Sequence, residues 1–325
     1  MLNYIIRRIL YAIPILIGVN FITFFLFFVI NSPDDMARMH LGQKHITPEA
    51  IANWKAEKGY DLPAFWNQQQ SGLKKISNTL LFEQSTKLFM FDFGYSDSGR
   101  SIKDDIKTRA IPSLAIAIPS LILGLILNII FAMTMVFFRN TKFDLITVAI
   151  TVVLMSISGL FYIIGGQYLF AKVMHLVPVS GYVPSINGMI FLILPVFIAV
   201  VSGLGSGARW YRTLFLEEMG KDYVRTARAK GLSETKVLLN HVLRNALIPI
   251  LTGVVVILPT LFMGSLLLES FFGIPGLGSY TIDAIQAQDF NIVRAMVFLG
   301  AVLYVLGLLL TDISYTLVDP RVKLS

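Results

Sequence analysis

The sequence predicts an all-α integral membrane protein with six transmembrane helices. Of its 325 residues, 55% are apolar and 14% are charged, whereas soluble domains have about 25% charged residues. Six apolar segments reach or approach the roughly 20 residues that a helix needs to cross a hydrocarbon core about 30 Å thick. They are Ile9–Ile30, Ile111–Phe138, Leu145–Ala171, Met189–Gly205, Ile248–Leu268 and Ala295–Thr316. The chain has no cysteine, so disulfides and Cys-based metal sites are excluded.

The first apolar segment begins like a secretory signal peptide, because Arg7 and Arg8 precede it. It is about 22 residues long and ends at Asn31-Ser-Pro without a small-residue cleavage site. We therefore expect it to be retained as a membrane anchor.

Lysine and arginine are distributed unequally between the loops, and this predicts the orientation of the chain. Basic residues in short loops mark the cytoplasmic side. The loops on one side hold Arg7, Arg8, Arg139, Lys142, Arg209, Arg212, Lys221, Arg225, Arg228, Lys230, Lys236, Arg244, Arg321 and Lys323, and those on the other hold Lys172 and Arg294. Both termini are therefore expected in the cytoplasm. The net charge of +7 then reflects membrane orientation and contact with lipid, and no nucleic-acid partner is expected.

The predicted organisation has three parts. Residues 1–30 form an N-terminal tail and the first helix, residues 31–108 an external loop or cap, and residues 109–325 a five-helix core with a polar loop at about 207–247. In the cap, Thr47 before Pro48 predicts a helix start, and Gly59 predicts its end. His40 and His45 are expected to be solvated loop side chains, because no carboxylate cluster accompanies them.

The polar loop of the core predicts two short helices around a turn. Apolar residues recur at every fourth position, as on one stripe of a helix; they are Phe215, Met219, Tyr223 and Ala227. Gly231 is expected to end this helix because glycine readily adopts the left-handed conformation. Ser233 is then a candidate N-cap for a second helix that leads towards Ile248. On these grounds alone, the loop could either dock on a soluble partner or lie on lipid headgroups.

Residues Tyr223–Gly231 read Tyr-Val-Arg-Thr-Ala-Arg-Ala-Lys-Gly. This run resembles the signature loop of binding-protein-dependent ABC importer permeases of the peptide/nickel subfamily. Arg225-Thr226-Ala227 stand where the wider family has Glu-Ala-Ala, a departure typical of the peptide subfamily. The resemblance continues through His241–Pro249, Phe91–Ser96, Glu269–Gly278 and Asp312–Arg321. It is closest to the B-type oligopeptide/dipeptide subunit, and the stretch 68–88 looks like extra sequence.

The resemblance implies a type I ABC importer permease fold in the bacterial inner membrane. It also implies a second homologous permease subunit, two cytoplasmic ABC ATPases that bind ATP and Mg, and an extracytoplasmic solute-binding protein. The short helix ending at Gly231 would be the coupling helix against one ATPase. The residues expected to contact it are Asp222, Tyr223, Val224, Arg225, Thr226, Ala227, Arg228, Ala229, Gly231 and Leu232. No catalytic residue, metal site or cofactor is expected on this chain.

Other classes of protein fit the sequence less well. No phosphate-binding Gly-x-x-x-x-Gly-Lys-[Ser/Thr] motif occurs, so ATP hydrolysis is expected on separate chains. Gly203-Leu-Gly205-Ser-Gly207 follows a membrane helix, and its Gly203/Gly207 pair suits close helix contact rather than dinucleotide binding. A proton- or ion-coupled carrier would need ionisable groups deep in the spans, where Asn128 is the clearest polar side chain. A nickel importer subunit, a secondary transporter and a membrane scaffold remain as alternatives.

Overall fold

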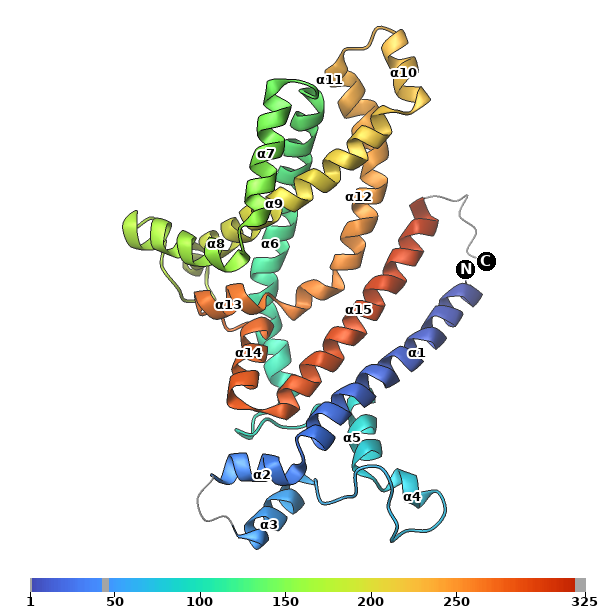
Figure 1. Ribbon diagram of the computed structural model, residues 1–325, viewed down its shortest axis with the longest axis vertical. Coiled ribbons are helices and arrows are strands. Elements are labelled where there is room, and N and C mark those ends of the chain that lie inside the picture. The colour runs from blue at the N-terminus through green and yellow to red at the C-terminus, as the bar shows by residue number, and fades with distance from the viewer. Residues whose placement is uncertain (1, 43–46, 319–325) are drawn as a thin grey trace. The chain divides into compact units, whose positions relative to one another are not determined.

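The computed structural model describes residues 2–42 and 47–318 (Figure 1). Its regular secondary structure is helical in these residues, apart from an isolated bridge between Tyr95 and Ser101. The predicted all-α class is therefore confirmed. The chain forms two compact units, one from residues 1–106 and 284–305 and the other from residues 107–283 and 306–325. The last residues of the predicted Asp312–Arg321 motif lie outside the described part.

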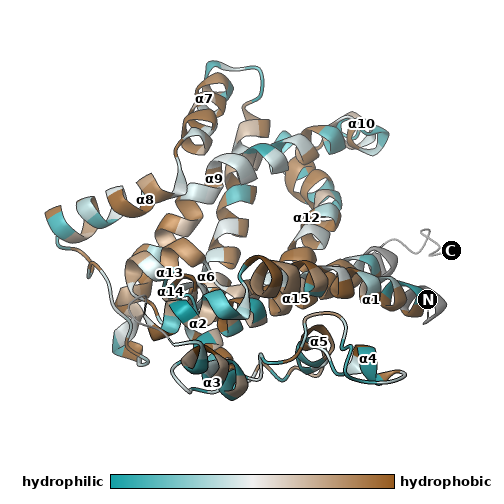
Figure 2. Cartoon of the chain, turned by 60° about the horizontal axis from the view of Figure 1, so that its bottom comes forward, coloured by the Kyte–Doolittle hydropathy of each residue, from teal (hydrophilic) through white to brown (hydrophobic). Residues whose placement is uncertain are grey.

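Five helical segments in the described residues are long and apolar enough to cross a membrane. They are Ile6–Ile30, Ile102–Phe137, Ile186–Met219, Glu234–Met263 and Phe290–Ser314. A sixth apolar stretch consists of α7 (Lys142–Ser156) followed by α8 (Gly159–Gly166) and η2 (Gln167–Val173), with a bend of 90° between the two parts. Hydrophobic residues dominate these elements, whereas hydrophilic residues gather on α2, α3 and α10 (Figure 2).

The bend replaces the single helix predicted over Leu145–Ala171. Ile157 and Ser158 both have extended backbones, which interrupts the helical hydrogen bonds between α7 and α8. The Tyr162 hydroxyl donates a hydrogen bond to the carbonyl oxygen of Leu154 over 2.7 Å. This bond satisfies one of the carbonyl groups that the end of a helix leaves without an intrahelical partner.

The first unit holds the segment predicted to be the external cap. Its elements are α1 (Leu2–Phe24), η1 (Phe25–Ile30), α2 (Pro33–Leu41), α3 (Pro48–Lys58), α4 (Lys74–Ser77), α5 (Leu80–Phe89) and the first part of α15 (Phe290–Val318). Its core is rich in aromatic residues and joins η1 to the cap: Phe24, Phe28, Met36, Tyr60 and Leu80 are all buried. Large aromatic side chains supply much buried area per residue, so a short, mostly polar segment can still pack firmly.

Local signals in the cap are confirmed for α3 and corrected for His40. Thr47 Oγ1 accepts a hydrogen bond from the Ala50 N–H over 3.3 Å, and Gly59 ends the helix at φ +70°. His40 is not simply solvated: its Nε2 lies 3.1 Å from the Asp97 carboxylate, and its ring stacks on Trp54. His45 lies outside the described residues.

Arg294, assigned from the sequence to a loop on the side opposite the cytoplasm, is 7% exposed in the first unit. Its Nη2 donates to Gln84 Oε1 over 2.6 Å, and its guanidinium lies 5.1 Å from the Phe28 ring centroid. Gln84 and Leu80 belong to the stretch 68–88, whose role the sequence left open. This stretch therefore contributes an acceptor for a buried cation and part of an aromatic core.

Besides α8, η2 and the last part of α15, the second unit contains the following helices. They are α6 (Ile102–Phe137), α7, η3 (Ile186–Met189), α9 (Ile190–Met219), α10 (Asp222–Ala229), α11 (Glu234–Val237), η4 (Leu238–Leu243), α12 (Arg244–Ile257), η5 (Pro259–Met263), α13 (Leu266–Phe272) and most of α14 (Leu277–Ala287). Figure 1 shows α10 and α11 at one end of this unit, and α13 and α14 at the opposite end.

Gly205 makes the closest contact between α7 and α9. A Cβ at Gly205 would lie 2.7 Å from the Thr151 carbonyl oxygen and 2.8 Å from the Met155 nitrogen. The predicted close contact with a neighbouring helix is confirmed for Gly207 but not for Gly203. A Cβ at Gly203 would meet nothing within 4 Å, and one at Gly207 would meet the Asn128 side chain of α6. Three glycines on one helix therefore have three different surroundings.

Glu269 organises the end of the unit opposite α10. It is fully buried, and its carboxylate accepts hydrogen bonds from the N–H groups of Ser265 and Ser279, each over 3.0 Å. The hydroxyl of Ser113 on α6 also bonds to Glu269 and accepts the Leu277 N–H over 2.8 Å. One carboxylate thus connects α13, the start of α14 and α6, which gives the Glu269–Gly278 motif a structural role.

Candidate functional site

The loop between α9 and α11 consists of a short helix that is separate from α9. The helix α9 ends at Met219, and the Gly220 N–H bonds to the Glu217 carbonyl oxygen over 3.1 Å. Lys221 is extended at ψ 153°, and α10 begins at Asp222. The single helix predicted through Phe215 and Ala227 is therefore broken in two. An acidic residue suits the first turn of the new helix, because that end of the helix dipole is positive.

One face of α10 is buried against the helices that carry it. Val224 is 0% exposed and Ala227 is 4% exposed. Both belong to a hydrophobic cluster drawn from α6, α9, α10, α11, η4 and α12, which also contains Ala132, Val136, Phe215, Met219, Val237, Leu238, Val242, Ala246 and Ile250. The residues of the predicted stripe thus pack on this cluster in spite of the helix break, so α10 is fixed to three long helices at once.

The opposite face of α10 is exposed. Its members are Asp222, Arg225, Thr226, Ala229 and Lys230. Arg225 Nη1 lies 3.6 Å from the Asp222 carboxylate, but the two side chains are 75% and 96% exposed. An ion pair so open to solvent contributes about 1 kcal/mol or less, so these groups remain available to another surface.

Tyr223 connects α10 to the end of α9. Its hydroxyl donates a short hydrogen bond to the Glu218 carboxylate. Burial, together with this bond and the negative charge of Glu218, raises the pKa of Tyr223 to about 12. The phenol is therefore neutral at physiological pH, and its bond bridges the break at Gly220.

Gly231 ends α10 as the sequence predicts. Its backbone has φ +79°, and its N–H bonds to the Arg228 carbonyl oxygen over 2.9 Å. A Cβ at this position would meet nothing within 4 Å. The turn therefore requires glycine for its left-handed backbone, which other residues adopt at a cost of roughly 1–2 kcal/mol, and not for lack of space.

A salt bridge closes the loop across this turn. Arg228 Nε lies 2.7 Å from Glu234 Oε1 and joins α10 to the first residue of α11. Ser233 is the N-cap residue of α11, as predicted, but its side chain makes no capping hydrogen bond. From Glu234 to Ile257 the chain is helical throughout, through α11, η4 and α12.

The structure brings the ten predicted contact residues into one compact loop, but it gives them different roles. Val224 and Ala227 are internal, Tyr223, Arg228 and Leu232 are half-buried, and the other five are exposed. Sequence reasoning missed Glu218 and Glu234, the partners of Tyr223 and Arg228. Each belongs to a helix adjoining α10, and no periodic pattern relates them to their partners.

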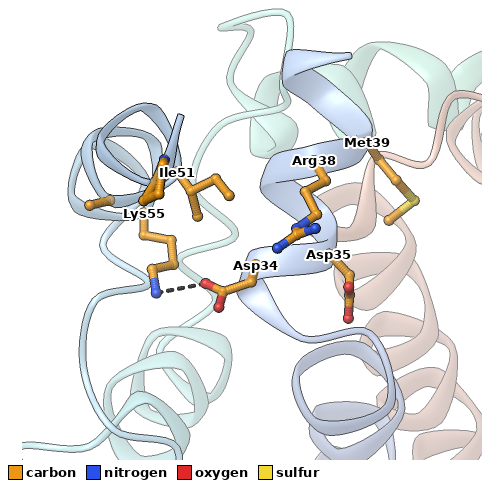
Figure 3. A pocket seen from close by; sticks show the side chains of 8 residues that line it. Asp34, Asp35, Arg38, Met39, Ile51 and Lys55 are labelled. Carbon is orange, nitrogen blue, oxygen red and sulfur yellow. Dashed lines mark ion pairs between the residues drawn. The ribbon is translucent and has the colours of Figure 1, made fainter. Parts of the chain in front are cut away.

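A cleft with a volume of about 740 Å³ lies between α2 and α3 in the first unit. Figure 3 shows Asp34 and Arg38 of α2 turned towards Ile51 and Lys55 of α3. Lys55 Nζ lies 2.7 Å from Asp34 Oδ1. No group of three or more His, Cys, Asp or Glu side chains capable of holding a metal occurs in the part of the chain that the structure describes. The cleft thus presents charges of both signs.

Comparisons with known proteins identify the family of the chain. The family described as binding-protein-dependent transport system inner membrane component matches residues 105–324, and its N-terminal companion matches residues 1–113. A putative peptide transport system permease protein of Brucella abortus (strain 2308) is 32% identical over 325 residues, with 98% of each chain covered. The dipeptide transport system permease protein DppB of Escherichia coli (strain K12) is 29% identical over 351 residues, and the glutathione transport system permease protein GsiC of Shigella flexneri serotype 5b (strain 8401) is 31% identical over 333 residues, each with 99% of both chains covered. The chain therefore belongs to the family of inner membrane components of binding-protein-dependent transport systems, and it is a multi-pass protein of the bacterial inner membrane.

Proposed function

We propose that this chain is a permease subunit of an ATP-driven peptide importer and that α10 is its coupling helix, seated on a cytoplasmic ATPase. The observation that carries the proposal is the two-sided character of α10. Val224 and Ala227 fix one face to the core of α6, α9 and α12, while Arg225 and its neighbours leave the other face exposed. A force applied to the exposed face therefore acts on three membrane helices.

The same observation weighs against contact with lipid headgroups as the main role of α10. A helix that lies in the membrane interface needs an apolar face turned towards the acyl chains. The apolar face of α10 is already used inside the protein, and its exposed face has only alanine as an apolar member. The exposed face matches a polar protein surface better than a bilayer.

The remaining subunits follow from the family and from the charge distribution. A second permease completes the membrane part, two ATPases bind ATP and Mg, and a solute-binding protein delivers cargo from outside. The lysine and arginine residues around α10 support a cytoplasmic position for this loop and for both termini. The mixed charges of the cleft between Asp34 and Lys55 suit a soluble partner on the outer side.

The peptide cargo is inferred from the relatives. Proteins with matching length are named for peptides, dipeptides and glutathione, and all three kinds of cargo contain amide bonds. Nickel transport remains the second candidate within the family. Uptake competition between di-, tri- and longer peptides and nickel in a deletion strain separates the two: loss of nickel uptake with intact peptide uptake would overturn the peptide assignment.

The coupling role is tested by Gly231→Leu in the complete complex reconstituted in vesicles. The variant should insert and assemble, but it should take up at least tenfold less peptide per ATP hydrolysed, because the turn that presents α10 is distorted. Gly220→Ala is the matched control, since Gly220 has φ −78° and accommodates alanine. Normal uptake per ATP by Gly231→Leu would refute the assignment of α10 as the coupling helix.

A further inference from the structure

The turn between α6 and α7 carries a compact aromatic patch, made of Phe137, Phe138 and Phe143. The centroid of the Phe138 ring lies 4.9 Å from that of Phe137 and 4.9 Å from that of Phe143, at interplanar angles of 83° and 62°. Such edge-to-face arrangements are favourable for aromatic pairs. The three side chains are nevertheless 46%, 42% and 43% exposed, in chain order. The turn therefore presents packed aromatic rings to the surroundings of the protein.

The aromatic patch lies at the end of two exposed apolar stripes. The stripe on α6 consists of Ile126, Ile130 and Phe137, and the stripe on α7 consists of Phe143, Ile146 and Ile150. Spacings of three, four and seven positions place the members of each stripe on one face of a helix. These side chains are between 43% and 56% exposed. Lipid acyl chains suit apolar faces of this kind along membrane-spanning helices, and the aromatic patch marks the end of both faces.

Two basic side chains border the aromatic patch without an ion-pair partner. Arg139 follows Phe138 and is half-buried, and Lys142 precedes Phe143 and is exposed. Neither forms an ion pair with a carboxylate in the part of the chain that the structure describes. Asp144, the closest acidic residue in sequence, is already engaged by Arg212 of α9 over 2.9 Å. The turn thus has two uncompensated positive charges beside exposed rings.

The backbone of the turn is fixed by hydrogen bonds, so the charges and the rings keep their places. Thr141 Oγ1 donates to the Phe138 carbonyl oxygen over 2.6 Å and accepts the Asp144 N–H over 3.4 Å. Between them, Asn140 has φ +63°, and its N–H bonds to Asp144 Oδ2 over 3.2 Å. A surface that is ordered before binding loses little conformational entropy when a ligand arrives.

We propose that this turn binds one anionic phospholipid. Arg139 and Lys142 hold the phosphate, and the acyl chains lie against the aromatic patch and the stripes that continue from it. Aromatic and basic residues gather where a membrane meets water, and basic clusters at the cytoplasmic ends of membrane helices bind anionic headgroups. The turn lies at the same end of the second unit as α10, the end where lysine and arginine are concentrated (Figure 1).

Other occupants fit this surface less well. A zwitterionic phospholipid would bring a positive amine beside Arg139 and Lys142, whereas an anionic headgroup brings only the charge that they lack. A cytoplasmic ATPase could cover the turn, but it would leave the apolar stripes on α6 and α7 uncovered. An acyl chain covers the rings and the stripes without a break.

A phospholipid at this turn stabilises the helices that carry α10. Val136, which precedes the aromatic patch on α6, belongs to the hydrophobic cluster behind α10. On the other side of the turn, Asp144 joins α7 to α9 through Arg212. A ligand that holds the ends of α6 and α7 together therefore stabilises the folded protein in proportion to its occupancy.

Photo-labelling tests the site in the complete complex, held in nanodiscs of phosphatidylcholine with a trace of photoactivatable phosphatidylglycerol. The label should be recovered on the turn, and Arg139→Gln/Lys142→Gln should reduce it at least tenfold. Photoactivatable phosphatidylcholine should label the turn at least tenfold less. Lys172→Gln is the matched control, because Lys172 Nζ also lies beside an aromatic ring, 5.8 Å from the Tyr168 centroid. It should leave the labelling of the turn unchanged.

The outcomes separate the lipid from other partners. Equal labelling of the turn by the two lipids would overturn the preference for an anionic headgroup. Labelling that Arg139→Gln/Lys142→Gln leaves unchanged, or no labelling at all, would overturn the site itself. Cross-linking of the turn to an ATPase in place of lipid would assign this surface to that partner and refute the proposal.

A conservative variant and a second readout separate loss of charge from loss of fold. Arg139→Lys/Lys142→Arg keeps both charges and should keep the labelling. Phosphatidylglycerol should raise the unfolding temperature of the unaltered complex more than that of Arg139→Gln/Lys142→Gln, while the two unfold alike in phosphatidylcholine alone. An equal or larger rise for the double variant would contradict the proposal. Neither measurement involves peptide or ATP, so the result is independent of the proposed function.

Discussion

Arg212 of α9 holds Asp144 of α7 with one nitrogen, since Nη2 lies 2.9 Å from Oδ1 and 3.0 Å from Oδ2. The side chains are 24% and 13% exposed, so the pair is shielded more than a surface salt bridge. Asp144 Oδ2 also accepts the Asn140 N–H over 3.2 Å. The contact fixes the start of α7 to the helix that leads into α10.

Asp144→Asn should destabilise the protein by about 2 kcal/mol, between the values typical of exposed and of fully buried pairs. The cause is the guanidinium that is left without its counter-charge. The double variant Asp144→Leu/Arg212→Met should be closer in stability to the unaltered protein, because it removes both charges. Thermal unfolding in detergent measures the difference, and a double variant less stable than Asp144→Asn would contradict this account.

Gly205→Ala and Gly203→Ala should have opposite effects although they are two positions apart on one helix. A methyl group at Gly205 meets backbone atoms of α7 that cannot rotate away, so a loss of about 3 kcal/mol is expected from overpacking. At Gly203 the methyl group meets open space, and the gain in helix propensity is up to about 1 kcal/mol. The comparison is made by unfolding midpoint and by yield of monodisperse protein. Equal effects would show that α7 and α9 are further apart than described.

The Tyr223 phenol should titrate at unusually high pH. Its pKa in the folded protein is about 12, compared with 10.0 for an unperturbed tyrosine. The stabilisation from the neutral phenol is therefore complete below pH 10 and is lost as the pH rises through about 12. The tyrosinate absorbance of the unaltered protein minus that of Tyr223→Phe isolates this titration. A difference curve centred near pH 10 would contradict the bond to Glu218.

Gln84→Leu should destabilise the first unit more than Arg294→Met does. Nε and Nη1 of Arg294 have no hydrogen-bond partner in the described residues, and Gln84 supplies the acceptor for Nη2. Removing that acceptor leaves a buried cation unpaired, with an expected cost of about 3 kcal/mol, whereas removing the cation leaves only a neutral amide. Resistance of the 31–106 segment to limited proteolysis reports the order. The reverse order would mean that the guanidinium has another partner.

The spans and the turn at Gly231 could be predicted because they depend on properties local in sequence. Runs of apolar residues predict membrane helices, and a glycine after a helical pattern predicts a left-handed end. The bend at Ile157 was missed although Ser156, Ser158 and Gly159 surround it, because serine and glycine are also common within membrane helices. The break at Gly220 was hidden because the spacing of buried residues continues across it.

The contacts of the candidate site depend on how each helix is rotated about its axis, and one sequence does not determine this. Gly203, Gly205 and Gly207 are equivalent as sequence, yet only Gly205 faces the backbone of α7. Likewise, nothing in the sequence distinguishes Arg294 from other basic residues near the end of a span. Only the fold brings Gln84 beside it. Such pairings are far apart in sequence and leave no periodic signal.

Ile250 belongs both to the hydrophobic cluster behind α10 and to the wall of a cavity. It is fully buried in the cluster that holds α10, and it is also one of the residues around a cavity of about 540 Å³ between α6, α9 and α12. Between Glu234 and Ile257 the backbone is helical at every residue, so the segment connects the loop that carries α10 to the cavity wall without a break. Under the proposed coupling role of α10, this continuity would carry a movement of the loop to the cavity wall that Ile250 lines, without any further moving part.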